Sequence, residues 1–128
     1  MADYALKPKS EAKVAKAYGR GLRISTKHST IVCKELTGMN LQKGKLLLEG
    51  MVGQKRSLDG KFYPNVAEEL LNLIKSAESN AEFKGLDANK LIIHATSHKG
   101  FTFFRPRNFK IRRQQRKVSN LQVVLQQR

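Results

Sequence analysis

The chain has 128 residues, a formal net charge of +15 and a pI near 10.3, a charge far outside that of ordinary cytosolic enzymes. This length suits one domain with a modest core, and the charge predicts a polyanionic partner, above all nucleic acid. The single cysteine excludes an intrachain disulfide and fits a reducing compartment, and no apolar run reaches the ~18 residues of a membrane span, so we expect no membrane partner.

The first half of the chain predicts a short strand and two helices. Residues 18–25 alternate apolar and polar side chains, as a half-buried strand does. Ser25 or Thr26 then caps a helix that Gly38 ends. Asn40 caps a second helix, which continues to residue 53.

The third helix has the clearest pattern, whereas Gly44 weakens the prediction of the second. Asn65 and Glu68 have the spacing of a capping box, and Gly85 suits the C-terminal cap. Apolar residues between them recur at steps that trace one helical face. These residues are Val66, Leu70, Leu73, Ile74, Ala77 and Ala81.

Residues 90–97 and 118–126 predict two strands, which flank the most basic part of the chain. The connecting residues 98–117 contain no acid and hold four of the six phenylalanines. If the two strands pair antiparallel, the connection continues them as a hairpin reaching about 30 Å beyond the body. Its basic side chains are Lys99, Arg105, Arg107, Lys110, Arg112, Arg113, Arg116 and Lys117.

We therefore predict an α+β fold in which three helices pack on a small three-stranded antiparallel sheet, with a long protruding basic β-hairpin. The single domain divides into a basic N-terminal extension over 1–14, a globular body over 15–97 and 118–128, and the hairpin over 98–117. A two-stranded ribbon is marginal in water and like charges weaken it further, so we expect a polyanion to order it. A disordered basic tail is the alternative reading of the same residues.

Folded RNA suits this pattern better than DNA. The clearest helix carries four glutamates against one lysine, which disfavours insertion into a DNA major groove. Folded RNA offers crevices and irregularly spaced phosphates to a thin basic hairpin. The phenylalanines then stack on unpaired bases or pack between RNA helices, although Phe101 and Phe103 can instead pack against the body.

Three segments, in order along the chain, resemble the universal large-subunit ribosomal protein twenty-two family, called seventeen in eukaryotic numbering. They are AKAYGRGLRISTKHSTIVCKELTGMNLQKGKLLLEGM at 15–51, SAESNAEFKGLDANKLIIHATSHKG at 76–100 and RPRNFKIRRQQRKVSNLQVVL at 105–125. The second is especially similar to the archaeal and eukaryotic branch. The chain departs from the family at Thr26, where proline is frequent, and at the hairpin tip, which is shorter than in many bacterial relatives.

The resemblance implies a structural, non-enzymatic constituent of the cytoplasmic large ribosomal subunit whose hairpin lines the nascent-peptide exit tunnel. The implied partners are large-subunit rRNA, neighbouring ribosomal proteins and the nascent polypeptide, with no DNA. Body contacts to rRNA fall on Arg20, Arg23 and Lys27, and we add the basic pair Lys55 and Arg56. The hairpin contacts are its eight basic residues, and the tip comprises Arg107, Asn108, Phe109 and Lys110.

We expect no cofactor, metal or catalytic residue. His94 and His98 lie about 13 Å apart on a strand, too far to share a metal ion. His28 and Cys33 lack a third residue that would orient them for nucleophilic chemistry. The rival function is a free-standing RNA chaperone or nucleic-acid-compacting protein, which would bind many nucleic acids with little preference.

Overall fold

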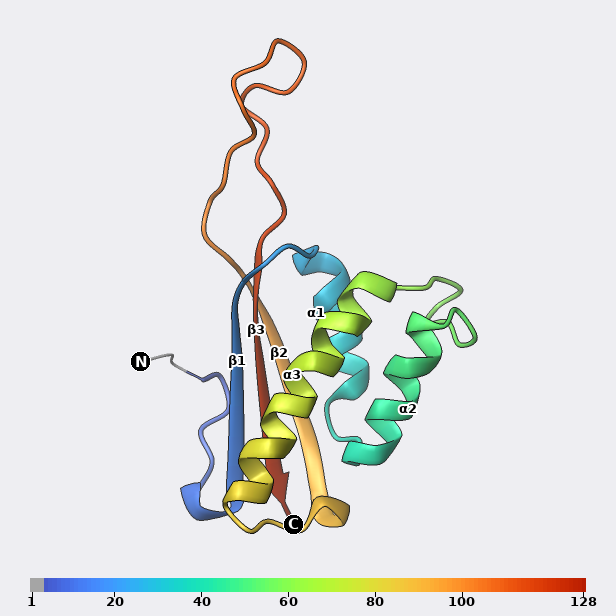
Figure 1. Ribbon diagram of the computed structural model, residues 1–128, viewed down its shortest axis with the longest axis vertical. Helices are drawn as coiled ribbons and strands as arrows, with labels where there is room; N and C mark the ends of the chain where they lie inside the picture. The colour runs from blue at the N-terminus through green and yellow to red at the C-terminus, as the bar shows by residue number, and fades with distance from the viewer. Residues whose placement is uncertain (1–3) are drawn as a thin grey trace.

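The computed structural model describes residues 4–128, in which an antiparallel sheet forms one layer and helices form the other (Figure 1). The strands are β1 (Val14–Leu22), β2 (Leu91–Lys99) and β3 (Ser119–Gln127), arranged in the order β1-β3-β2. Leu121, Val123 and Leu125 of the central strand are fully buried in the core, which confirms the face predicted from their alternation. The other predicted strand is also present, within two residues of its expected ends.

The first strand begins earlier than the predicted range of 18–25. Ala15 and Ala17 are buried opposite Leu125 and Val123, and their small side chains leave room for the helix that packs on them. The chain leaves the sheet near Gly21, whose φ of 70° accompanies an irregularity in the register with β3. The strand prediction missed the two alanines because an alternation of small residues is a weak strand signal.

Three helices cover one face of the sheet: α1 (Thr26–Leu36), α2 (Leu41–Val52) and α3 (Pro64–Phe83) (Figure 1). In this layer α3 packs on β1 and β3, α1 packs on β2, and α2 packs against α3. The first two helices begin after Ser25 and Asn40, as predicted, although neither of these side chains makes a capping hydrogen bond. None of the helices within residues 4–128 is long and apolar enough to cross a membrane.

The N-terminus of α3 differs from the prediction. Tyr63 precedes the helix and Pro64 occupies its first turn, where the fixed φ of proline is already helical and no N–H is lost. The capping box expected between Asn65 and Glu68 is therefore wrong, because both residues lie inside the helix. The predicted apolar face is buried except at Leu73, which is only half-buried at the edge of the core.

Gly44 explains how α2 approaches the sheet. This residue is buried in the middle of the helix, and a Cβ atom added to it would lie 2.4 Å from Cδ1 of Ile93 on β2. The glycine that weakened the helix prediction is therefore the residue that permits close packing of α2 on the core. Its cost in helix propensity is about 1 kcal/mol, which the packing of the surrounding leucines offsets.

Residues 98–117, here called the basic extension, connect β2 to β3 and project beyond the end of the sheet (Figure 1). Only its first two residues belong to a strand, and between Lys99 and Ser119 the sole ladder contact is an isolated bridge from Phe104 to Gln115. The two arms are thus mostly irregular, and the continuous β-ribbon expected from the sequence is absent. The two arms carry like charges and have no packed face. Pairing them as strands therefore yields too little free energy to maintain a regular ladder in water.

The described part of the predicted N-terminal extension packs on the body, while residues 1–3 of that prediction lie outside the described range. The backbone N–H of Ala5 donates to Oε1 of Gln122 at 2.9 Å, on the sheet face opposite the helices. The Tyr4 ring meets the Tyr18 ring edge-on with centroids 6.1 Å apart, and the Lys16 ammonium lies 5.4 Å from the Tyr4 centroid. This segment therefore covers part of the outer face of the sheet.

Candidate nucleic-acid interface

The root of the basic extension is held by close contact between its two arms. Gly100 donates its N–H to the carbonyl of Val118 at 2.9 Å, and a Cβ atom at Gly100 would lie only 2.6 Å from Cγ1 of Val118. Phe101 packs on Gly21, where an added Cβ would lie 2.9 Å from the ring. Since glycine occupies both contact points, the root is narrow and fixed to the end of β1.

Further out, a few backbone hydrogen bonds still join the arms. Arg105 donates its N–H to the carbonyl of Gln114 at 2.9 Å, and Arg116 donates to the carbonyl of Phe103 at 2.6 Å. The Arg116 guanidinium also lies 5.4 Å from the Phe103 centroid, and its Nε atom is buried without a hydrogen-bond partner. Arg116 is therefore partly a packing residue, and it is the one cation of the extension that is half-buried.

At the far end, the chain turns through the four predicted tip residues. The backbone N–H groups of Ile111 and Arg112 both donate to the carbonyl of Asn108. Phe109 is 83% exposed, and the Arg112 guanidinium lies 5.6 Å from the centroid of its ring. The tip thus presents a bare aromatic ring and several guanidinium groups, which suit stacking and phosphate contacts.

None of the cations on the basic extension is neutralised by an acid in the described part of the chain. The ion pairs among residues 4–128 join Lys16 to Glu11, Lys45 to Glu78 and Lys90 to Asp87, all outside the basic extension. Every basic side chain of the extension is exposed except that of the half-buried Arg116. Such an array can bind closely spaced phosphates and release their counterions.

A groove at the root brings body and extension cations together, as the sequence alone did not predict. This root groove has a volume of about 310 Å³ and lies where the start of α1 meets both arms. Lys27 from the body lines it beside Lys99 and Lys117. An adjoining crevice of about 300 Å³ shares Ser25 and Lys117 with the root groove and adds Arg23.

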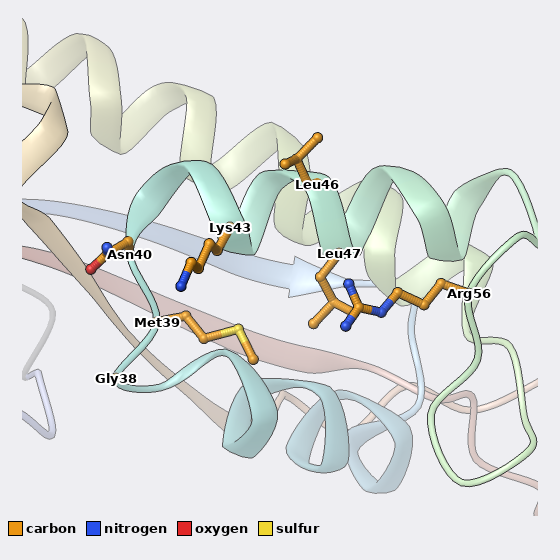
Figure 2. A pocket seen from close by; sticks show the side chains of 7 residues that line it. All are labelled: Gly38, Met39, Asn40, Lys43, Leu46, Leu47 and Arg56. Carbon is orange, nitrogen blue, oxygen red and sulfur yellow. The ribbon is translucent and has the colours of Figure 1, made fainter.

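The remaining predicted body contacts lie elsewhere. Arg20 is exposed on β1 and lines neither of these two hollows. Lys55 and Arg56 follow α2, and Arg56 lines a separate hollow between α1 and α2 together with Lys43 and Leu47 (Figure 2). The basic pair is therefore not part of the surface at the root of the extension.

The crevice beside the root groove also contains aromatic residues that sequence reasoning missed. Phe62 is 43% exposed and Tyr63 is buried, and both line the crevice with His28. The His28 and Tyr63 rings lie 5.0 Å apart between centroids. The sequence shows these residues only as a Phe-Tyr pair directly before a proline. Where the two rings lie depends on how α3 packs beside α1.

Cys33 and His28 do not form a nucleophilic pair. Cys33 is buried in the core, and burial raises the pKa of its thiol from 9.0 to about 12. His28 instead faces Tyr63 at the surface. The buried thiol stays protonated near neutral pH, so this pair has none of the features of an activated nucleophile.

The sequence of this chain is similar to one protein family and to several archaeal proteins. A family model described as Ribosomal protein L22p/L17e matches residues 17–126. Large ribosomal subunit protein uL22 of Archaeoglobus fulgidus is 33% identical over 118 residues, covering 77% of this chain and 76% of the relative. The protein of the same name from Methanococcus maripaludis is 34% identical over 148 residues, covering 95% and 97%.

Proposed function

The chain belongs to the ribosomal protein L22p/L17e family, and we propose that its basic extension binds large-subunit rRNA and lines the nascent-peptide exit tunnel. Like the uL22 relatives, it is a structural constituent of the large ribosomal subunit and not an enzyme. Its partners are accordingly rRNA and other ribosomal proteins.

One observation carries the proposal: a thin projecting segment keeps all of its positive charge unneutralised within residues 4–128. The like charges of such a segment repel one another in water. Their electrostatic stabilisation is greatest where phosphates surround the segment on several sides. We propose that rRNA supplies this surrounding and that the two arms then align as the basic hairpin expected over 98–117. Backbone hydrogen bonds that already join Gly100 to Val118 and Arg105 to Gln114 support this alignment.

The residues divide by task in this proposal. Arg105, Arg112 and Arg113 contact phosphates along the extension, while Arg23 and Lys27 continue the contact onto the body. The exposed Phe109 ring, with its neighbours at 107, 108 and 110, lies closest to the emerging polypeptide. The body over 15–97 and 118–128 serves as the anchor, since its buried core holds both ends of the extension.

Sucrose-gradient fractionation of native lysate tests the assignment to the ribosome. We expect the protein to sediment with large subunits and to remain there in moderate salt, because many phosphate contacts must break together. Recovery only from the non-ribosomal pool would refute the function and favour the rival RNA chaperone.

Site-specific photocrosslinking tests the tunnel separately. A photoreactive phenylalanine analogue at position 109 should crosslink to a stalled nascent chain on purified ribosomes. The same analogue at Phe83, which is 94% exposed at the end of α3, is the matched control and should not. Equal yields from both positions, or none from position 109, would contradict the placement of the tip.

A further inference from the structure

The crevice beside the root groove combines aromatic rings of the body with cations of both the body and the basic extension. We call it the aromatic crevice; Phe62, Tyr63 and His28 supply its rings, and Arg23, Asn65 and Lys117 lie around them. Among residues 4–128, no acid lines either this crevice or the root groove. Ser25 and Lys117 line both hollows, so the two lie next to each other.

The chemistry of the aromatic crevice fits a nucleobase. The partly exposed Phe62 ring is available for stacking, and the rings of His28 and Tyr63, which contact each other, also line the crevice. Every base has a π-face, and aromatic stacking is the usual way in which proteins hold unpaired bases. The Asn65 side-chain amide is exposed at the crevice and has both a donor and an acceptor for a base edge.

The root groove fits the phosphates on either side of such a base. Lys27, Lys99 and Lys117 converge there, and the buried Nε of Arg116, which also lines the groove, has no hydrogen-bond acceptor. An anionic oxygen in this groove would meet several cations. The hydroxyl of Ser25 adds a further donor beside it, whereas the Thr26 hydroxyl is bonded to that of Ser119.

Resting on the proposed function, we propose that the aromatic crevice holds one unpaired base of single-stranded RNA while the root groove binds the adjoining phosphates. The extension is then anchored at its root by a nucleotide extruded from the RNA fold, in addition to the phosphate contacts along its arms. A basic protein segment is disfavoured as the occupant, because cations line both hollows.

The hollow between α1 and α2 serves as the internal comparison (Figure 2). It too has two basic side chains, Lys43 and Arg56, yet its other walls include Met39, Leu46 and Leu47 and no aromatic ring. The nucleotide proposal therefore predicts that removing a cation there leaves binding of single-stranded RNA unchanged.

A tryptophan reporter in the full-length protein tests the proposal directly. The chain contains no tryptophan, so the Phe62→Trp variant has a single indole at the crevice and keeps the stacking surface. An adenosine hexanucleotide should quench its fluorescence, whereas inorganic tripolyphosphate should bind without comparable quenching. In parallel, Phe62→Ala should weaken hexanucleotide binding by about five- to a hundredfold, which is the loss of one stacked base.

Two matched controls isolate the crevice. Phe83→Ala removes an equally large exposed ring from another surface and should leave hexanucleotide binding unchanged. Lys117→Ala should weaken binding of both hexanucleotide and tripolyphosphate, whereas Lys43→Ala should affect neither. Thermal melting of each variant separates loss of binding from loss of fold.

The outcomes also separate this inference from the function on which it rests. Hexanucleotide binding that neither quenches the indole nor responds to Phe62→Ala would overturn the aromatic crevice while leaving rRNA binding by the extension intact. A wild-type protein that binds no hexanucleotide would overturn the crevice as well. Neither result would overturn the assignment to the ribosome, which failure to sediment with large subunits would refute.

Discussion

Replacing Arg107, Arg112 and Arg113 together by alanine should weaken rRNA binding and make it less sensitive to salt. All three side chains are exposed, and none has an ion-pair partner within residues 4–128. Each phosphate contact contributes about 0.7–0.9 to the slope of log affinity against log salt, so three contribute about 2–3. If wild type and variant bind equally at about 1 M salt, this difference in slope makes the variant about a hundredfold weaker at about 0.15 M salt. That loss of affinity corresponds to about 2.7 kcal/mol of binding free energy. Arg116 is excluded from the variant because it is half-buried against Phe103, whereas Arg112 lies on the exposed Phe109 ring.

Filter binding of deproteinised large-subunit rRNA over a range of salt concentrations measures the slope. In the control variant, alanine replaces three exposed lysines, one on each helix: Lys34, Lys43 and Lys75. This variant has the same net charge as the arginine variant. The arginine variant should lose slope and the lysine variant should not, while both melt like the wild type. An equal loss in both variants would show that net charge matters and location does not. A lower melting temperature of the arginine variant would show that those charges stabilise the fold, which would refute the reasoning.

Three further predictions concern the body and the root. Leu70→Ala should lower the free energy of unfolding by about 2–5 kcal/mol in urea, because that side chain is fully buried. Leu73→Ala should cost clearly less, since Leu73 is half-buried; equal costs would contradict the assigned face of α3. Gly100→Ala should push the arms apart at Val118 and abolish the slow hydrogen exchange expected of the N–H of residue 100, and retained protection would argue against the close contact. Cys33 should resist iodoacetamide at pH 8 until the protein unfolds. Because burial raises the pKa of its thiol to about 12, the wild type should lose stability relative to Cys33→Ala as the pH rises from about 9 towards 12, and parallel curves would count against this.

The helical layer was largely predictable because its signals are local. Apolar spacing placed the inward face of α3, and residues 25 and 40 marked the starts of the other helices. The errors have physical causes that a local pattern does not contain. Pro64 competes with the capping box for the start of α3, and the role of Gly44 depends on a side chain nearly fifty residues away in β2.

The extension was predictable in its charge and position but not in its backbone. Its basic residues and flanking strands follow from composition and alternation. Whether its arms form strands depends on a balance between backbone hydrogen bonds and the repulsion of like charges. In the structure, a single isolated bridge joins the two arms. That balance changes with the surrounding ions, so no property of the sequence alone determines it.

The interface at the root needed the tertiary structure. Arg23 and Lys27 were predicted as separate body contacts, and antiparallel pairing of β1 with β3 brings the start of α1 to the base of the arms. Phe62 had no distinguishing pattern, because its exposure is set by the packing of the loop before α3 against α1. Sites built from segments distant in sequence remain hidden until those segments are assembled.

The central position of β3 determines when the body can complete its fold. β1 and β2 each pair with β3 and not with each other, and β3 follows both of them along the chain. During synthesis the helices can form early, but the two outer strands wait with unpaired edges until residues 119–127 emerge. Such edges invite pairing with other chains, and the basic arms meanwhile attract any nearby polyanion. The outer strands are therefore open to mispairing until one late step, when the last strand inserts between its neighbours.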